Sequence, residues 1–580
     1  MKLLLRKVAL LAIVLKCSAA YTAELEINVQ HTFNGDPLLL DSLRYQNAAG
    51  ETMSVTRLSY LLSDFALERP EGGWVELPNQ HAWMDAATQR TRLRLVDIPE
   101  GKYRALRFSI GLDPKTNASD AAQWPAEHPL NPAVNGLHWS WQGGYIFLAL
   151  EGHHRVGSGD HTGYALHLAR DPNQTRISLS MALDLKQEAA LLLGFDVGSL
   201  LNSPRVLSFS KDGSTTHSRK DDPIATMLVT NLPGAFRLQQ IASPALTRNA
   251  SAPVKPIDFP EKYTPYPFTM SRTFPLPDLP RDNPLIIERV ALGERLFHEK
   301  GLSRDGSISC ATCHQAEVAF TDRLPVSKGI EDRLGQRNAM PLFNLAWKTS
   351  FFWDGRAPSL RSQALMPIQD HLEMDETLEQ VTAKLATDPA YAPLFKAAFG
   401  TSGITSEKLG LSLEQYLLTI TSFDSKFDRA LNGRDKFTDE EARGFELFMT
   451  ESDLRTEQRG ADCFHCHGGP LFSDHQFHNN GLKLSGPGRA DVTKLPGDEG
   501  KFATPSLRNV ALTAPYMHDG RFATLEEVVD HYRTGIQHSP TLDPNLAKHP
   551  GGGIPLSDAD RSALVAFLRT LTELQDGQGK

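Results

Sequence analysis

Beyond its first twenty residues, the 580-residue sequence has no apolar run long enough to cross a bilayer, and it contains only five cysteines. It also lacks a basic tract, because 60 Lys and Arg residues face 69 Asp and Glu residues and give a net charge of −9. A mildly acidic chain of this kind is a poor partner for nucleic acid or for an anionic membrane. We therefore expect no nucleic-acid partner and no membrane span.

The one sustained apolar stretch lies at the start, where residues 1–20 read MKLLLRKVALLAIVLKCSAA. A basic beginning, a short apolar run and small residues at Ser18 and Ala20 are typical of a cleaved secretory signal peptide. A lipid-modified Cys17 is disfavoured, because Lys16 stands where a small residue is required. We expect export to the periplasm, which leaves four cysteines in the mature chain.

Those four cysteines form two pairs, and a histidine follows each pair at once: Cys310, Cys313 and His314 in the first motif, and Cys463, Cys466 and His467 in the second. In an exported protein, four cysteines would ordinarily suggest two disulfides. In Cys-x-x-Cys-His, however, the two thiols can bond to the vinyl groups of one haem while the histidine binds its iron. A zinc half-site or a redox pair leaves the repeated histidine unexplained. The sequence thus predicts two covalently bound haem c groups.

The pattern along the chain predicts several domains. Residues 24–246 alternate polar and apolar positions in short runs, which is typical of an all-β, sandwich-like antiparallel domain. Nine prolines between Pro253 and Pro284 indicate a linker or wrapping segment over 247–284. The helical remainder carries an internal repeat, because Ala291–Phe297 and Ala442–Phe448 precede the two motifs at similar distances. We expect two mainly α-helical cytochrome c-type domains, 285–435 and 436–580.

The second axial ligand decides whether a haem carries electrons or reacts with a small molecule. No histidine lies between His314 and His371, so the first haem is expected to be open on one side. For the second haem, Thr524 and Glu527 predict the capped start of a short helix. Apolar spacing places Tyr532 on its buried face and His531 off it. From this pattern alone, Tyr532 is a ligand or a core residue.

Residues 285–575 resemble the bacterial di-haem cytochrome c peroxidases, and more closely their MauG and MbnH relatives. The resemblance rests on both haem motifs, on Phe352-Trp-Asp-Gly-Arg356, and on the run from Ala514 to Gly520. It implies that Tyr532 replaces the methionine that binds the second haem in the peroxidases. An anionic phenolate stabilises oxidised iron better than a neutral thioether does, so the second haem would store oxidising equivalents.

The same resemblance implies further site residues. Trp353 would lie between the haems, and Gln363, Pro367 and Glu373 would line the open side of the first haem, where Glu373 moves protons as peroxide is cleaved. An inter-haem calcium ion would be held by oxygens of Asn338, Thr513 and Pro515. The loop 328–336 contains no displaceable histidine ligand, so no reductive activation is expected.

Residues 24–246 resemble the MbnP domain, through Leu137–Tyr145 and Leu148–Gly152. The resemblance implies copper binding, and oxidation of an MbnP tryptophan to kynurenine by an MbnH-type enzyme. We expect Trp83 to be that tryptophan, with His81, two residues before it on a strand, as a copper ligand beside it. The alternatives for the tryptophan are Trp139 and Trp141, and a second copper ligand would be His154 or one of His31, His153, His161 and His167.

The sequence therefore predicts a periplasmic, peroxide-using di-haem oxidoreductase. Its substrate would be its own N-terminal domain or a related copper protein. Its cofactors would be two haem c groups, calcium and copper. Two alternatives stay open: an ordinary cytochrome c peroxidase supplied by a small electron-donor protein, and a copper-binding or electron-transfer protein.

Overall fold

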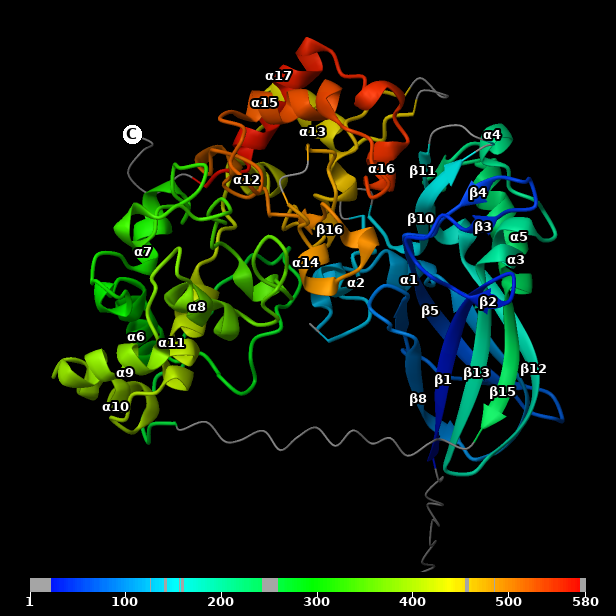
Figure 1. Cartoon of the computed structure of the whole chain (residues 1–580). Helices are drawn as coiled ribbons and strands as arrows, with labels where there is room; N and C mark the ends of the chain where they lie inside the picture. The colour runs from blue at the N-terminus through cyan, green and yellow to red at the C-terminus, as the bar shows by residue number, and fades with distance from the viewer. Residues whose placement is uncertain are drawn as a thin grey trace, which may run out of the picture.

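The structure is a computed structural model that describes residues 22–125, 127–139, 143–155, 157, 161–242, 259–453, 458–483 and 486–573. The predicted signal peptide, Trp141, the last four residues of the predicted β-domain (243–246) and residues 247–258 of the predicted linker lie outside the described residues. A β-rich N-terminal domain stands beside two helical domains, which form the other side of the molecule (Figure 1). This is the predicted order of a β-domain followed by two cytochrome c-type domains.

Two sheets build the N-terminal domain. The smaller sheet contains β15 (Phe236–Ala242), β13 (Glu188–Asp196), β1 (Thr22–Phe33), β2 (Asp36–Pro37) and β8 (Arg92–Pro99). The larger sheet runs through β12 (Thr175–Leu185), β9 (Gly101–Ile110), β5 (Arg57–Glu68), β10 (Ile146–Arg155), β11 (Thr162–Ala169) and β14 (Thr215–Thr216). Short strands extend its edges: β3 (Tyr45–Gln46), β4 (Thr52–Met53), β6 (Trp74–Glu76) and β7 (Ala82–Asp85).

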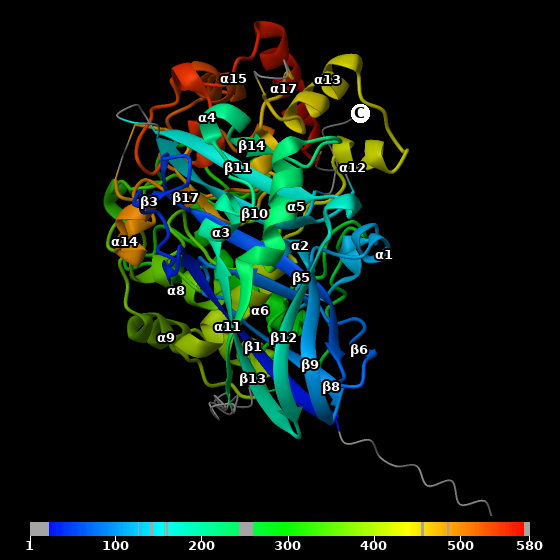
Figure 2. The ribbon, with the colours of Figure 1, turned by 90° about the vertical axis from the view of Figure 1, so that its right-hand side faces the viewer.

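The predicted antiparallel pairing is wrong in two places. The short strand β14 runs parallel to β11. β1 and β13 run parallel, from the pair Glu24 and Glu188 to the pair Thr32 and Asp196. Parallel neighbours require a long crossover, and here almost the whole domain lies between the two strands. The domain also contains α5 (Pro223–Ala235), which packs against α3 (Val197–Asn202) and lies along the outer face of the domain (Figure 2). Asp222 caps α5, because its side chain accepts hydrogen bonds from the amides of Ile224 and Ala225.

The helices of the two haem domains follow in order. The first domain has α6 (Ile287–Phe297), α7 (Cys310–Cys313), α8 (Leu360–Gln369), α9 (Leu378–Thr387), α10 (Tyr391–Phe399), α11 (Ser406–Thr419) and α12 (Lys426–Leu431). The second has α13 (Asp439–Phe448), α14 (Ala490–Thr493), α15 (Leu525–Asp530), α16 (Pro544–Ala547) and α17 (Asp558–Thr570), with the strand pair β16 (Phe477–His478) and β17 (Phe502–Ala503). No helix in the described part of the chain is long and apolar enough to cross a membrane.

The sequence repeat corresponds to a structural one. α6 packs on α11, and α13 packs on α17. A Cβ added to Gly293 of α6 would lie 2.0 Å from the Ser412 carbonyl oxygen, and one added to Gly444 of α13 would lie 1.9 Å from that of Ala563. Each repeat glycine therefore lets two helices touch at the same position in its domain.

The segment after residue 258 wraps the first haem domain. Phe274 is fully buried in the core of that domain, where its ring meets Trp347 edge-on. The Trp347 indole donates a hydrogen bond of 2.6 Å to the Pro275 carbonyl oxygen. The proline-rich stretch, at least over 259–284, is therefore part of the packed structure.

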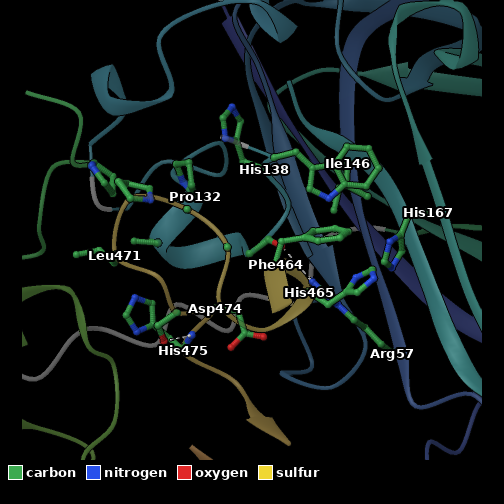
Figure 3. Close-up of a pocket in the computed structure, with 18 of the residues that line it drawn as sticks. Arg57, Pro132, His138, Ile146, His167, Phe464, His465, Leu471, Asp474 and His475 are labelled. Carbon is green, nitrogen blue, oxygen red and sulfur yellow. Dashed lines mark hydrogen bonds between the residues drawn. The ribbon is translucent and has the colours of Figure 1, made fainter. Parts of the chain in front are cut away.

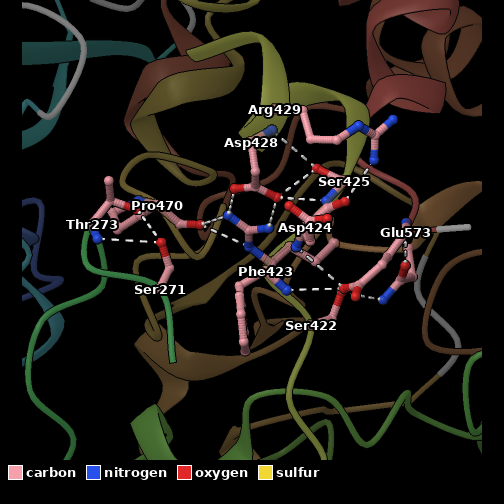
Figure 4. A network of polar contacts seen from close by, with 12 residues as sticks. Ser271, Thr273, Ser422, Phe423, Asp424, Ser425, Asp428, Arg429, Pro470 and Glu573 are labelled. Atoms are coloured by element: carbon pink, nitrogen blue, oxygen red, sulfur yellow. Dashed lines mark hydrogen bonds and ion pairs between the residues drawn. The ribbon is translucent and has the colours of Figure 1, made fainter. Parts of the chain in front are cut away.

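A buried ion pair joins α12 to the second haem domain. Arg508 is almost fully buried and makes two bonds to Asp428, of 2.8 and 2.9 Å, as well as two to the Pro470 carbonyl oxygen. Asp428 belongs to a network that continues through Ser425 (Figure 4). Phe427 of α12 also packs against Phe567 of α17. α12 therefore packs against the second haem domain, although the predicted boundary at residue 435 assigns it to the first.

The N-terminal domain contacts the second haem domain directly. α16 lies against β11 so closely that a Cβ on Gly163 would fall 1.9 Å from the Pro544 carbonyl oxygen. His153 of β10 shares a hydrogen bond of 2.8 Å between its Nε2 and the Leu542 carbonyl oxygen. This contact fixes which side of the β-domain faces the second haem motif.

Candidate active site

The first haem motif begins a short helix. Ser309 and Thr312 form a reciprocal capping box on α7, so the two cysteine side chains are held on one turn. His314 follows, and its Nδ1 lies 2.8 Å from the Phe320 carbonyl oxygen. A carbonyl only accepts, so Nδ1 donates and the lone pair is on Nε2, as an axial iron ligand requires.

A cavity of about 620 Å³ opens beside this motif. Its lining includes Cys310, Cys313 and His314, and also the four residues singled out from the sequence: Trp353, Gln363, Pro367 and Glu373. α8 presents Gln363 and Pro367, and the turn after its C-terminus carries Glu373. Residues distant in sequence thus converge on one space large enough for a prosthetic group.

Glu373 is suited to move a proton in this cavity. Burial and the nearby Asp370 carboxylate raise the pKa of Glu373 to about 7, although Arg356 acts in the opposite direction. The backbone carbonyl of Glu373 accepts a 2.9 Å hydrogen bond from the Ile330 amide, which lies in the loop 328–336. That loop therefore holds the backbone of Glu373 in place.

His371, the residue that ends the histidine-free stretch after His314, also lines the cavity. Its side chain is 75% exposed, and its Nδ1 lies 3.7 Å from an Asp370 oxygen. The ring therefore stands at the rim of the cavity, turned toward solvent. The inference that the first haem is open remains a prediction.

The second haem motif repeats the geometry of the first. Cys463 to His465 form a 3₁₀ turn, and Nδ1 of His467 lies 3.0 Å from the Phe472 carbonyl oxygen. Tyr532 lies within electrostatic range of the Cys466 and Cys463 thiols of this motif. Its hydroxyl accepts a bond of 3.3 Å from the Asn480 side-chain amide. Burial raises the pKa of Tyr532 to about 12, so a phenolate here requires a nearby cation such as iron.

The helix that carries Tyr532 begins as predicted and ends differently. The Thr524 and Glu527 capping box is present, but the α-helix stops at Asp530 and continues as a π-helical turn, His531–Gly535. The wider turn shifts the side-chain directions. His531 is buried and its Nε2 lies 2.9 Å from the Asn480 carbonyl oxygen, so the expectation that it leaves the buried face is wrong. π-helical turns are frequent at functional sites.

Trp353 and Asn338 connect the two motifs. The Trp353 indole donates a hydrogen bond of 2.9 Å to the Asn338 carbonyl oxygen, and its ring lies 6.5 Å from that of His518. The Asn338 amide donates to the His518 carbonyl oxygen, which brings Asn338 beside the loop that contains Thr513 and Pro515. The Asn338 side-chain NH₂ group donates to the carbonyls of Leu324 and Pro325. This leaves Oδ1 for a hard cation, so the donor chemistry fits calcium.

The structure does not bring His81 and His154 together. Residue 82, next to His81, pairs with Leu62 of β5, whereas His154 pairs with Met53 before that strand begins. The two histidines therefore lie about half the length of β5 apart along that strand. The His81 ring packs against Trp124 and His128, and the His154 ring stacks on Phe209. These two histidines therefore cannot share one copper ion.

Trp83 lies inside the β-domain. It is 7% exposed, its indole donates a 2.8 Å hydrogen bond to the Ser59 hydroxyl, and the Arg90 guanidinium covers its ring at 4.9 Å. The predicted pairing with His81 on one strand face is not present, since the neighbours of His81 are Trp124 and His128.

A different tryptophan faces the second haem motif. Trp139 lines a small cavity of about 60 Å³ together with Phe464 and His465, the two residues between Cys463 and Cys466. Figure 3 shows Phe464 and His465 reaching from the haem motif toward His167 of β11. The Trp139 ring lies 5.6 Å from that of His217 and 6.2 Å from that of His167.

Two family models match the chain: one described as di-haem cytochrome c peroxidase over residues 287–436, and one described as MbnP over residues 22–218. The methylamine utilization protein MauG of Methylorubrum extorquens is 39% identical over 297 residues, which cover 50% of this chain and 80% of that protein. The cytochrome c551 peroxidase of Pseudomonas aeruginosa is 34% identical over 365 residues, 61% of this chain and 92% of that protein. The chain belongs to the di-haem cytochrome c peroxidase family.

A solved structure is also similar to this di-haem peroxidase. It is described as a MauG-like protein associated with microbial copper homeostasis, and it shares 34% sequence identity with a TM-score of 0.48. The match covers 53% of this chain and 96% of that one.

Membership in the family implies two haem c groups and a reaction with peroxide. The residues present fit those groups, since each motif offers two thiols and a histidine whose Nδ1 is engaged by a backbone carbonyl. The four residues that the resemblance implied for the first haem line the cavity beside its motif, and their roles there stay predictions. Sequence reasoning missed His217 and His465, because no local pattern links a histidine of the β-domain to one inside a haem motif.

Proposed function

We propose that this di-haem peroxidase uses peroxide to oxidise a tryptophan of its own N-terminal domain, and that the tryptophan is Trp139. The product would be kynurenine: two molecules of peroxide would oxidise the indole ring to N-formylkynurenine and become water, and hydrolysis would then release the lost carbon as formate. The protein would work in the periplasm after removal of residues 1–20. The presence of an MbnP region and a di-haem peroxidase region in one chain supports this proposal.

The observation that carries the proposal is the position of Trp139. It lines the same cavity as Phe464 and His465, which are enclosed by the two haem-anchoring cysteines of the second motif. Trp83, the tryptophan favoured by the sequence, instead contacts Ser59 and Arg90 within the β-domain. Trp139 therefore borders the second haem motif, whereas the contacts of Trp83 lie within the β-domain.

The residues of the first haem cavity have a separate task. Bound haem supplies the cleavage of peroxide and the one-electron oxidations that follow. Glu373, with its pKa near neutrality, would take a proton from peroxide and return it to the leaving oxygen. Gln363 and Pro367 would shape the space in which peroxide binds.

Two residues would then serve the second haem. Trp353 lines the first cavity and bonds to Asn338, so it is placed to carry electrons between the haems. Tyr532 would bind the second haem iron as a phenolate and stabilise its oxidised form. A calcium ion held by Asn338, Thr513 and Pro515 would keep this region rigid.

Peptide mass spectrometry of the haem-loaded protein before and after peroxide tests the proposal. The peptide containing Trp139 should gain the kynurenine mass change, and Trp139→Phe should abolish it. Trp83→Phe is the matched control, since it removes a buried tryptophan of the same domain and should leave the modification intact. Fragment ions that place the mass change on Trp83, Trp124 or Trp141 instead would refute the assignment to Trp139.

A further inference from the structure

We propose that His167, His217 and His465 bind one copper ion, in a site that the N-terminal domain and the second haem motif build together. His167 comes from β11, His217 from the segment after β14, and His465 from between the two haem-anchoring cysteines. One ligand nitrogen from each of the three lies within 4.8 Å of the others. This inference does not rest on tryptophan oxidation.

The spacing suits a metal ion after a small adjustment. Three nitrogens bound at about 2.0–2.1 Å from one ion lie about 3.3–3.6 Å apart. In the structure the ligand nitrogens lie within 4.8 Å of one another. Ring rotations of His217 and His465, whose centroids are 5.1 Å apart, can shorten these nitrogen–nitrogen distances to those of a bound ion. The three rings already face one another, with His167 4.9 Å from His217 and 5.8 Å from His465.

One of the imidazoles presents a nitrogen that makes no hydrogen bond to any described residue. It is Nδ1 of His167, and this residue is more than nine-tenths buried. Buried polar atoms are rarely left unpaired, so such atoms call for a ligand. The other nitrogen of His167, Nε2, is held at 2.8 Å by Glu151, which is itself paired with Arg57 at 3.0 Å. A carboxylate that holds one ring nitrogen and leaves the other for an ion is the usual support of a metal-binding histidine.

Glu451 completes the set. Its Oε2 lies 3.0 Å from Nε2 of His465 and 3.1 Å from Nε2 of His217. Its other oxygen contacts the Lys548 ammonium, which also lies 3.3 Å from Asp462. One carboxylate oxygen of Glu451 therefore faces the imidazoles and is available as a fourth ligand. The Lys548 ammonium balances the charge of the other oxygen, so the buried carboxylate is not left unpaired.

The ligand chemistry selects the ion. Three imidazoles exclude calcium and magnesium, which prefer oxygen ligands, and the nearby thiols belong to the haem. Among divalent ions that bind imidazole, copper binds most tightly. Trp139 and Phe464 border the site, so an ion bound here would lie between the β-domain and the haem peptide.

The test uses haem-loaded protein that has been stripped of copper and never exposed to peroxide. Cu(II) is titrated against a competing chelator, and bound copper is measured by elemental analysis and by EPR. The wild-type chain should bind one copper with nitrogen hyperfine structure. His217→Gln should weaken binding by about 100-fold or more, because even loss of a supporting residue around a metal costs about 10- to 100-fold.

His154→Gln is the matched control. His154 is also a buried β-domain histidine with unpaired ring nitrogens, but it stacks on Phe209 away from the three. It should keep wild-type copper affinity, and both variants should retain two haems by pyridine haemochrome. The proposal is overturned if wild type binds no copper, if His217→Gln binds as wild type does, or if His154→Gln is the variant that loses the ion.

Discussion

At the residue scale, Glu373 makes the reaction with peroxide depend on pH. Its pKa of about 7 means that the carboxylate, the form that accepts a proton from peroxide, increases as pH rises through neutrality. The kcat/KM for peroxide should therefore rise through about pH 7 and level off above it. Glu373→Gln should lower it by about 100- to 10,000-fold and remove this step. Stopped-flow kinetics of both proteins from about pH 5.5 to about 8.5 measures this pH dependence. If kcat/KM of the variant still rises through about pH 7, a group other than Glu373 causes the rise.

Tyr532 tests the role of the second haem separately. Tyr532→His keeps a strong ligand but removes the anionic phenolate. If this costs about 3 kcal/mol of stabilisation of oxidised iron, tryptophan oxidation should fall about 100-fold, while peroxide consumption at the first cavity survives in part. Quantitative mass spectrometry together with a peroxide electrode measures the two rates. Equal losses in both would show that Tyr532 acts on the first site as well.

The sequence could identify residues whose role follows from a local pattern or a family motif. The haem cysteines and their histidines are adjacent in the chain, and Gln363, Pro367 and Glu373 line one cavity as the resemblance implied. His217 and His465 carry no such signal, because their partners are brought close only by the docking of two domains. His81 and His154 were wrongly paired for another reason: the strand register that separates them along β5 cannot be read from the sequence.

At the scale of elements, periodicity and capping residues predicted helices well. The repeat helices and the Thr524 capping box are present. The π-helical turn after Asp530 was not predictable, and it coincides with a contact between His531 and the Asn480 carbonyl group, far away in the sequence.

The helix crossing of α13 and α17 depends on Gly444. Gly444→Ala would place a methyl group against the Ala563 carbonyl oxygen, so we expect a destabilisation of about 1–3 kcal/mol. Gly234→Ala in α5 meets nothing within 4 Å and should be neutral or stabilise by up to about 1 kcal/mol. Denaturant midpoints, followed by haem absorbance for Gly444→Ala and by circular dichroism for Gly234→Ala, provide the comparison. If Gly444→Ala proves as stable as wild type, the crossing tolerates more space than the structure shows.

At the scale of the whole molecule, the order of domains was readable from composition and spacing, whereas their contacts were not. Nothing in the alternation of β1 reveals that β13 is its parallel partner. Nothing in the second haem motif reveals that α16 and His465 meet β11 and its neighbours. The proposed function depends on this docking, because it places Trp139 beside the haem peptide of the same chain.

The most direct test is the rate of Trp139 modification at several protein concentrations. The peroxide concentration is the same in every sample and exceeds that of the protein. If the haem domains oxidise their own N-terminal domain, the first-order rate per chain should be independent of protein concentration, and kynurenine should appear in the Trp139 peptide. Peroxide consumption with every tryptophan unmodified would contradict the account and leave an ordinary peroxidase.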